Sequence, residues 1–302
     1  MSVSLAALLL AQISIPIGPR PRQVERPRAP IEETGPLWAA ECGTSTEWDQ
    51  PAPPVRIHGN TYLVGTCGIS AILIAGAEGH ALIDGGTERG ADRVAANIRS
   101  LGFRLADIRF ITHSHEHLDH VGGIARLLQL TGARLVASAP AARVFATGTN
   151  GVDDPQSGQL KPFPAAAVGR IIGDGDVIRL RDIQLTAIAT PGHTPGALSW
   201  QWESCDGGVC RTMVYADSLS PVSGPAYKFS ARPAALAAYR ASIARIASIR
   251  CEILMTPHPS ASAMKERMTG QQPLFDESGC KAYAERLTKA LDERLAKEAA
   301  AR

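Results

Sequence analysis

Four of the eight histidines in this chain lie between His113 and His120, in the stretch ITHSHEHLDHVGG. Neutral imidazole is the commonest protein ligand for zinc, and carboxylates complete such sites. His115 and His117 are two residues apart, so in an extended or turned segment their side chains leave on one side, while Asp119 and His120 project to a second place nearby. A lone histidine is usually an exposed polar residue, but this many ligand types in one turn predict two metal ions.

Two further histidines stand where such a site needs them. His193, in TPGHTPGALSW, and His258, in LMTPHPSAS, each follow an apolar run and lie in a turn rich in Pro or Gly. Turns of this kind fix the backbone at the end of a strand, where binding residues are commonly carried. We expect His113 to pack or hydrogen-bond beside the site, and we expect His58 and His80 to be ordinary surface or hairpin residues.

Short apolar runs alternate with helical patterns along the rest of the chain, which indicates an α/β fold. Strands are expected near residues 61–65, 69–75, 80–84, 108–112, 133–137, 184–190, 197–202, 212–216 and 252–256, and helices near residues 94–101, 122–130, 140–148, 233–248 and from residue 281. The stretch Thr147–Arg170 is rich in Gly, Asn, Asp, Pro and Gln and predicts a long loop, which in a compact domain is usually functional.

Composition limits the class of partner. Hydrophobic residues make up 45% of the 302 residues, which suffices for a large buried core, and we expect a single catalytic domain over residues 41–302. Lys and Arg number 31 against 29 Asp and Glu, and no basic run is present. Nothing therefore favours capture of nucleic acid or of a membrane surface. The default partner is a small molecule, and we expect a monomer.

The N-terminal residues indicate export. An uncharged apolar stretch at residues 5–11 is too short to span a bilayer, so we expect a signal peptide over residues 1–20, although no Lys or Arg precedes the stretch. Residues 21–40 carry Pro, Arg and Glu with little hydrophobicity and predict an extended leader.

The cysteine count supports the same compartment. An even number of cysteines suits an oxidising environment, with reduced cysteines as the alternative. Neighbouring cysteines enclose a Pro-rich stretch, a hairpin tip and a long loop, which favours sequential pairing, but six cysteines permit fifteen connectivities. The cysteines are Cys42, Cys67, Cys205, Cys210, Cys251 and Cys280.

The motif formed by His115, His117, Asp119 and His120, with a histidine in each of two downstream turns, resembles the signature of the metallo-β-lactamase superfamily. The runs PGHTPGALSWQW, YADSLSPVS and TPHPSASAM resemble the third subclass of the class B β-lactamases, from about Trp48 to the C-terminal helix. The resemblance implies an αββα sandwich of two mixed sheets with helices on the outer faces. It also implies a zinc β-lactamase of the periplasm.

The same resemblance implies the ligand sets. His115, His117 and His193 would hold one zinc ion, and Asp119, His120 and His258 would hold the other. Ser218 stands where the first subclass has a metal-binding cysteine, which favours the third subclass. The disulfide that the family carries over its last loop matches Cys251 with Cys280.

The resemblance further implies hydrolysis of the β-lactam ring of penicillins, cephalosporins or carbapenems, the activity that confers antibiotic resistance. Coordination lowers the pKa of water to about 7, so a hydroxide would serve as nucleophile, and Asp119 would orient it. Ser218 and Ser220 would contact the carboxylate of the substrate, unless they are loop serines, and Trp48 would line the groove, unless it is core. Asp84 would hydrogen-bond a ligand imidazole or cap a turn.

Other functions suit part of the same pattern. A glyoxalase II-like thioester hydrolase uses a bridging aspartate, and Asp217 lies one residue from the matching position. A lactonase or another hydrolase of the fold, or a zinc binder without catalysis, are further alternatives, since one fold hosts many functions. Six ligand side chains with room for a water disfavour a binder. The sequence does not rank the β-lactam classes.

Overall fold

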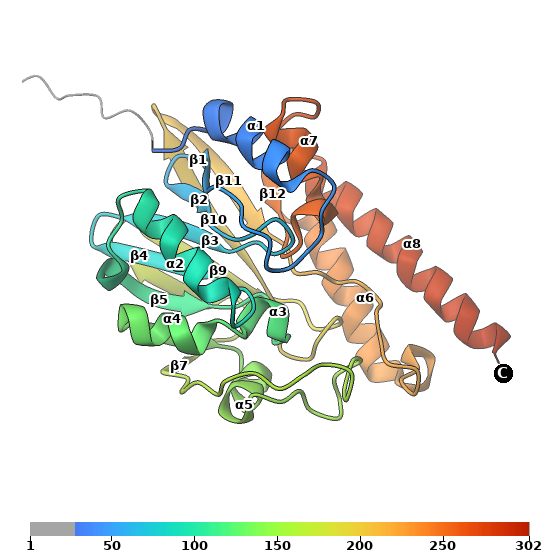
Figure 1. The fold of residues 1–302 in the computed structure, drawn as a ribbon. Coiled ribbons are helices and arrows are strands. Elements are labelled where there is room, and N and C mark those ends of the chain that lie inside the picture. The colour runs from blue at the N-terminus through green and yellow to red at the C-terminus, as the bar shows by residue number, and fades with distance from the viewer. Residues whose placement is uncertain (1–27, 302) are drawn as a thin grey trace, which may run out of the picture.

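The chain forms two β-sheets that face each other with helices on both outer surfaces (Figure 1), as expected for an αββα sandwich. The computed structural model describes residues 28–301. One sheet has seven strands in the order β1-β2-β3-β4-β5-β6-β7, and the other has five in the order β12-β11-β10-β9-β8. The proposed signal peptide lies outside the described residues. Within them, no helix is long and apolar enough to cross a membrane.

The N-terminal half builds the seven-stranded sheet. Strands β1 to β4 form antiparallel pairs, and the pairs from β4 through β7 are parallel with helices between them. The elements are α1 (Ile31–Cys42), β1 (Val55–His58), β2 (Thr61–Leu63), β3 (Ile72–Gly76), β4 (Gly79–Ile83), α2 (Gly90–Ser100), η1 (Leu105–Asp107), β5 (Ile108–Thr112), α3 (Leu118–Val121), α4 (Ile124–Thr131), β6 (Arg134–Ala137), α5 (Ala139–Thr147) and β7 (Arg170–Ile171).

The C-terminal half builds the five-stranded sheet, which is antiparallel except for the parallel pair β11 and β12. The elements are β8 (Val177–Leu180), β9 (Ile183–Ala189), β10 (Leu198–Asp206), β11 (Val209–Tyr215), η2 (Phe229–Ala231), α6 (Pro233–Ser248), β12 (Ile253–Met255), η3 (Pro259–Ser262), α7 (Met264–Met268) and α8 (Gly279–Ala300). Helices α6 and α8 pack against each other over this sheet, as Figure 1 shows.

Apolar side chains from both sheets fill the space between them. Ile74, Ile83, Leu185, Leu198 and Trp200 belong to this inner cluster and are buried. A strand that is covered on both faces buries successive residues, which is why all five residues of β4 are buried rather than every second one. This core keeps the ends of the strands in place, and the functional side chains stand on those ends.

One expectation from the sequence is wrong. Residues 31–40 are not an extended leader, because they lie in α1, whose Trp38, Ala39 and Cys42 are buried against the sandwich. Local composition hides this, since the helix is stabilised by packing against distant strands.

Of the two positions expected for His80, the hairpin is right and the surface is not. His80 pairs with Ala75 in the β3–β4 hairpin and is buried there. Its Nδ1 accepts a hydrogen bond from the Gly76 N–H, and its ring packs against Phe103.

Three disulfides confirm the sequential pairing. Cys42 bonds to Cys67, Cys205 to Cys210, and Cys251 to Cys280. The first ties the end of α1 to the loop before β3, the second closes the tip of the β10–β11 hairpin, and the third joins the start of β12 to α8. Their presence accords with an oxidising compartment.

Candidate metal centre

The six predicted ligand side chains come from three segments at one edge of the sandwich. His115 and His117 follow β5, Asp119 and His120 lie in the short helix α3, His193 follows β9, and His258 follows β12. Asp217 and Ser218 follow β11 at the same edge. Residues as far apart as His115 and His258 therefore meet because the carboxyl ends of these strands point the same way.

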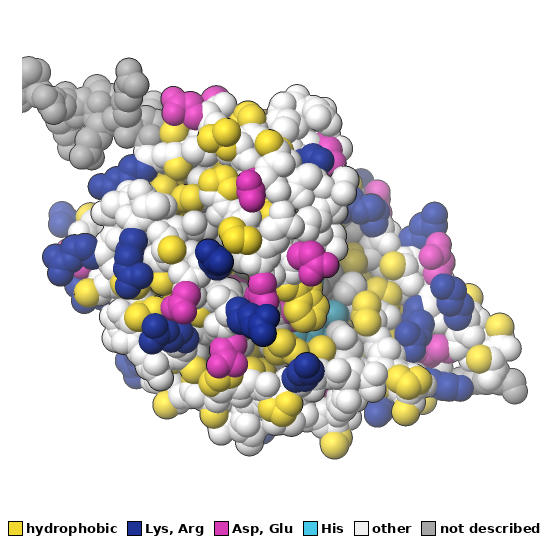
Figure 2. All heavy atoms as spheres, in the orientation of Figure 1, with side chains coloured by type: hydrophobic (Ala, Val, Ile, Leu, Met, Phe, Trp, Pro, Cys, Tyr) yellow, Lys and Arg dark blue, Asp and Glu magenta, His cyan; other side chains and the backbone are white. Residues whose placement is uncertain are grey.

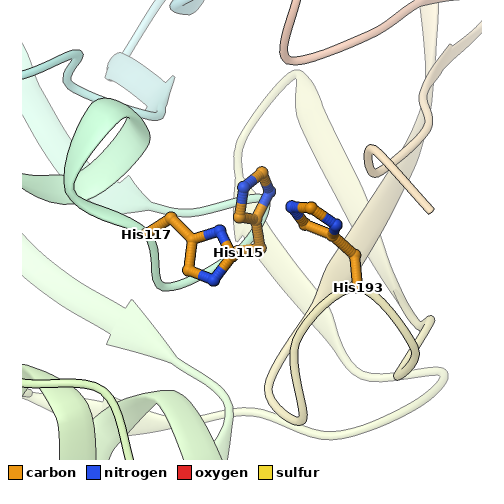
Figure 3. A group of neighbouring side chains, drawn as sticks. All are labelled: His115, His117 and His193. Atoms are coloured by element: carbon orange, nitrogen blue, oxygen red, sulfur yellow. The ribbon is translucent and has the colours of Figure 1, made fainter. Parts of the chain in front are cut away.

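His115, His117 and His193 form the first group. One ring nitrogen from each lies within 4.8 Å of the other two, and all three side chains are buried. Figure 3 shows the three rings turned toward a common point, with His193 approaching from the other sheet. This convergence confirms that the three residues lie together, as the sequence predicted.

Asp119, His120 and His258 form the second group. The Asp119 Oδ2 lies 3.1 Å from the His120 Nε2 and 3.6 Å from the His258 Nε2, and the two Nε2 atoms are 3.4 Å apart. Ligands about 2.0–2.1 Å from a tetrahedral zinc ion stand roughly 3.3 Å from one another. The triangle thus fits one ion. A His115 nitrogen lies within 4.8 Å of Asp119 and His120, so the two groups adjoin.

The outer ring nitrogens of the first group are held by hydrogen-bond partners, two of which are buried carboxylates. In the tautomers that leave one nitrogen free to bind a cation, the His115 Nδ1 donates to the Asp217 Oδ1 at 2.8 Å and the His117 Nε2 donates to the Asp154 Oδ2 at 3.1 Å. The His193 Nδ1 donates to the Ser220 carbonyl at 2.9 Å. Such partners fix ring orientation and strengthen the ligand, which is typical of metal-binding histidines.

Asp154 and Asp217 were not assigned these roles from the sequence. Asp154 lies in the predicted functional loop Thr147–Arg170, yet nothing in its neighbours distinguishes it from the exposed Asp153. Asp217 drew notice as a bridging ligand of the thioesterase alternative. In the structure its two oxygens face the His115 Nδ1 and the Leu219 N–H, on the outer side of the imidazole.

The second group is held differently. The His258 Nδ1 donates to the Gly68 carbonyl at 3.1 Å. The His120 Nδ1 is buried and has no hydrogen-bond partner among the described residues. The sequence offers Asp84 two roles, bonding a ligand imidazole or capping a turn. Its Oδ2 lies 3.7 Å from the His120 Nδ1, which is an ion-pair distance but too long for a hydrogen bond. Its Oδ1 accepts from the Ser114 N–H at 2.6 Å, which is the capping role and holds the ligand turn.

Burial and mutual contacts set the charges of the ligands. Burial lowers the pKa of His115, and it lowers the pKa of His193 to about 3 and that of His258 to about 4, so these rings are neutral and able to coordinate at neutral pH. Burial opposes charge on Asp119 and His120 as well, but their contact outweighs it. It lowers the pKa of Asp119 and raises the pKa of His120 to about 10. A cation would replace the His120 proton.

Two neighbours of the ligands support the turn and do not bind. The buried Glu116 accepts hydrogen bonds from the Thr194 Oγ1 at 2.6 Å and from the Gly196 N–H at 2.7 Å. It thereby joins the turn after β5 to the turn that carries His193. His113 accepts from the Ser138 N–H at 3.2 Å, away from the two groups, as expected for a packing residue.

Two of the predicted substrate residues lie beside the ligand groups. The Ser218 Oγ is buried and has no hydrogen-bond partner within residues 28–301, and the Ser220 Oγ lies 3.2 Å from the His193 Nδ1. Trp48 is 40% exposed, so it is a surface residue and not part of the core. Figure 2 shows a small histidine surface next to hydrophobic side chains. The His258 side chain is 34% exposed, so the second group is open to solvent on this ligand.

The arrangement suits metal-assisted hydrolysis. Two adjoining groups, each of three ligands that fit a metal ion, leave coordination positions open to water and substrate, which distinguishes a catalytic from a structural site. The ligands are five imidazoles and one carboxylate, the donor set that zinc takes in proteins.

Known proteins with this fold are close in sequence. The family profile named Metallo-beta-lactamase superfamily matches residues 64–208. The metallo-β-lactamase MIM-2 is 53% identical, with a TM-score of 0.85, over 88% of this chain and 98% of that one. MEM-A1, a subclass B3 metallo-β-lactamase from a soil metagenome library, is 41% identical, with a TM-score of 0.82, over 85% of this chain and 100% of that one.

Curated relatives match over shorter stretches. The "Probable metallo-hydrolase" of Burkholderia pseudomallei is 28% identical over 45% of this chain, and the match spans 48% of its own length. Hydroxyacylglutathione hydrolases of several bacteria are 29–34% identical over 26–40% of their lengths. These proteins match less than half of this chain, whereas MIM-2 and MEM-A1 match most of it. The chain therefore belongs to the metallo-β-lactamase superfamily and, within it, to subclass B3.

Proposed function

We propose that this protein is a zinc β-lactamase that hydrolyses the amide bond of the β-lactam ring and so confers antibiotic resistance. The observation that carries the proposal is the meeting of all six ligand side chains in two adjoining groups. The full-length similarity to MIM-2 and MEM-A1, both metallo-β-lactamases, supports the substrate class.

Each group would hold one zinc ion. His115, His117 and His193 would ligate the first, and Asp119, His120 and His258 the second. When bound, zinc polarises a carbonyl oxygen and lowers the pKa of a coordinated water molecule to about 7. No serine or cysteine nucleophile is then needed.

The protein's own residues then position the reactants. The Asp119 carboxylate, which contact with His120 keeps ionised, would accept a hydrogen bond from the attacking water and orient it. The Ser218 and Ser220 hydroxyls would hold the carboxylate of the substrate without neutralising it. Trp48, exposed at the rim, would supply apolar contact to the substituents of the drug.

Purified protein tests the proposal directly. Nitrocefin turnover should require zinc, vanish with a strong chelator and return when zinc is restored, and metal analysis should find two zinc ions per chain. Penicillin, cephalosporin and carbapenem substrates assayed side by side would rank the drug classes. Chelator-resistant turnover, or no turnover by the zinc-loaded protein, contradicts the proposal.

A thioester hydrolase is the second candidate, favoured by the partial similarity to hydroxyacylglutathione hydrolases. The placement of Asp217 speaks against it. Its Oδ1 is bound to the outer nitrogen of His115 and does not lie between the two groups as a bridging ligand would. Hydrolysis of a glutathione thioester without lactam hydrolysis would establish this candidate instead.

We further propose that the protein acts in the periplasm as a monomer. Three disulfides among the described residues accord with an oxidising compartment. Fractionation of cells that express the full chain would show the protein in the periplasmic extract, and gel filtration would give the mass of one chain.

A further inference from the structure

We infer that the Cys42–Cys67 disulfide and the segment Thr66–Ser70, named here the anchor segment, position His258 and so set the affinity of the second group for its cation. The inference rests on the proposed function, since it concerns a zinc ion held by Asp119, His120 and His258. Neither cysteine touches that group. They act through the backbone that orients one of its ligands.

Three hydrogen bonds join the anchor segment to the turn that carries His258. The Gly68 carbonyl accepts from the His258 Nδ1 at 3.1 Å. The Ser70 N–H donates to the Pro257 carbonyl at 2.7 Å, and the Ser70 Oγ donates to the Thr256 carbonyl at 2.8 Å. Each of the residues Thr256, Pro257 and His258 therefore has a hydrogen bond to the anchor segment. A shift of that segment would move the His258 imidazole.

The anchor segment is in turn held from its other side. The Cys67 N–H donates to the Gln50 carbonyl at 3.0 Å, and the Thr66 Oγ1 donates to the Trp48 carbonyl at 2.6 Å. A Cβ atom added to Gly68 would lie 2.4 Å from the Thr46 carbonyl oxygen, so only glycine fits there. The disulfide adds the one covalent restraint, between Cys67 and the end of α1.

Helix α1 gives that restraint a fixed support. It packs on β1 and on α7, and α7 begins shortly after His258, as Figure 1 shows at the top of the molecule. The approach is close, since a Cβ atom added to Gly35 would lie 2.7 Å from the Met268 carbonyl oxygen. Helix α1 thus contacts the chain after His258 and, through the disulfide, holds the segment that orients His258.

The first group has no such dependence. Its imidazoles are oriented by Asp217, Asp154 and Ser220, none of which lies in α1 or in the anchor segment. The His120 Nδ1 in the second group has no hydrogen-bond partner, so the bond from His258 to Gly68 is the one that fixes an imidazole there among the described residues. Opening the disulfide should therefore weaken one zinc site and spare the other.

The test compares two disulfides in the full chain. In one variant Cys42→Ser and Cys67→Ser are combined. In the matched control Cys205→Ser and Cys210→Ser are combined, which opens an exposed hairpin tip outside the ligand turns. Both zinc affinities are measured by competition with a chromophoric chelator, and the visible spectrum of the cobalt-loaded protein reports each site separately.

In the first variant we expect the zinc affinity of the second group to fall by about 10–100-fold, the range for loss of a ligand's orienting partner. The zinc affinity of the first group in this variant, and both zinc affinities of the control, should stay within about twofold of those of the unaltered chain. Ser70→Ala, which keeps the disulfide and removes one hydrogen bond, should weaken the same site by a smaller factor. Circular dichroism checks folding, and if the cysteine variant does not fold, Ser70→Ala decides.

Two results overturn the inference alone. In the first, the unaltered chain binds two zinc ions, and the cysteine and Ser70→Ala variants bind both ions with the same affinities as the unaltered chain. The other is an equal loss of both ions in a folded variant, which would mark a general loosening. An unaltered chain that binds a single ion instead contradicts the proposed dinuclear centre, and the inference falls with it.

Discussion

The two groups of the metal centre differ in how their ligands are held. In the first group every outer ring nitrogen has a hydrogen-bond partner, and two of these partners are buried carboxylates. In the second group one imidazole is held by a backbone carbonyl. The other has no hydrogen-bond partner on its Nδ1 among the described residues, and it forms ion pairs with Asp119 and, at 3.7 Å, with Asp84.

This difference shows that a shared ligand chemistry does not imply equal preorganisation. A neutral, oriented imidazole binds a cation without losing a proton or a rotamer, whereas the second group must exchange the His120 proton for the metal. We therefore expect the first group to bind zinc more tightly, and the following substitutions test the two groups separately.

The largest effect is expected from His117→Ala. It removes a ligand of the first group and should lower kcat/KM for nitrocefin at least about a thousandfold, because metal-supplied stabilisation is worth several kcal/mol. Metal analysis should show loss of one zinc ion, with an unchanged circular dichroism spectrum. Activity equal to that of the unaltered chain would remove His117 from the site.

Asp154→Asn tests the orienting carboxylate while keeping the shape of the side chain. Zinc affinity of the first group should fall about 10–100-fold, because His117 loses its charged acceptor. Asp153→Asn is the matched control, since this neighbour is exposed, whereas Asp154 is buried. If both variants bind zinc alike, the bond between Asp154 and His117 does not tune the metal.

Ser220→Ala separates substrate binding from metal binding. The backbone carbonyl that holds His193 remains, so zinc content should not change. The hydroxyl is lost, so KM for substrates that carry a carboxylate should rise about threefold to tenfold with kcat little affected. An unchanged KM would exclude the hydroxyl from substrate binding.

Glu252→Gln tests the strand that leads to the second group, with the smallest effect. The Thr212 N–H and the arginines Arg211 and Arg250 lower the pKa of Glu252 to about 2. Because the pKa of Glu252 is lower in the folded chain than in the unfolded chain, where it is about 4.5, its charge stabilises the fold at pH values above 4.5. This stabilisation is lost as the pH falls from 4.5 toward 2. The variant should have a Tm lower by about 2–5 °C at pH 7. That deficit should shrink with pH between 4.5 and 2.

A constant deficit across this range would contradict the role of the Glu252 charge. Turnover at 25 °C should match that of the unaltered chain, because Glu252 lies at the opposite end of β12 from His258.

Much of the site could be predicted from spacing and local pattern. The alternation of His115, His117 and Asp119 in a turn, and a histidine after each of two apolar runs, indicated ligands at strand ends, and the structure brings them together. Helix α1 could not be predicted in this way. Its apolar residues follow a weak helical pattern, Pro36 lies inside it, and its burial depends on strands and a disulfide partner that lie further along the chain.

The sequence by itself determined the ligand types, their order and the strand ends that carry them, because residue spacing decides which side chains leave a turn on the same side. Only the tertiary structure decided which partner holds each imidazole. Asp154, Asp217 and Gly68 acquire that role by folding against histidines 37, 102 and 190 residues away. Burial strengthens these hydrogen bonds, and the burial of a residue in the folded chain cannot be read from its neighbours in the sequence.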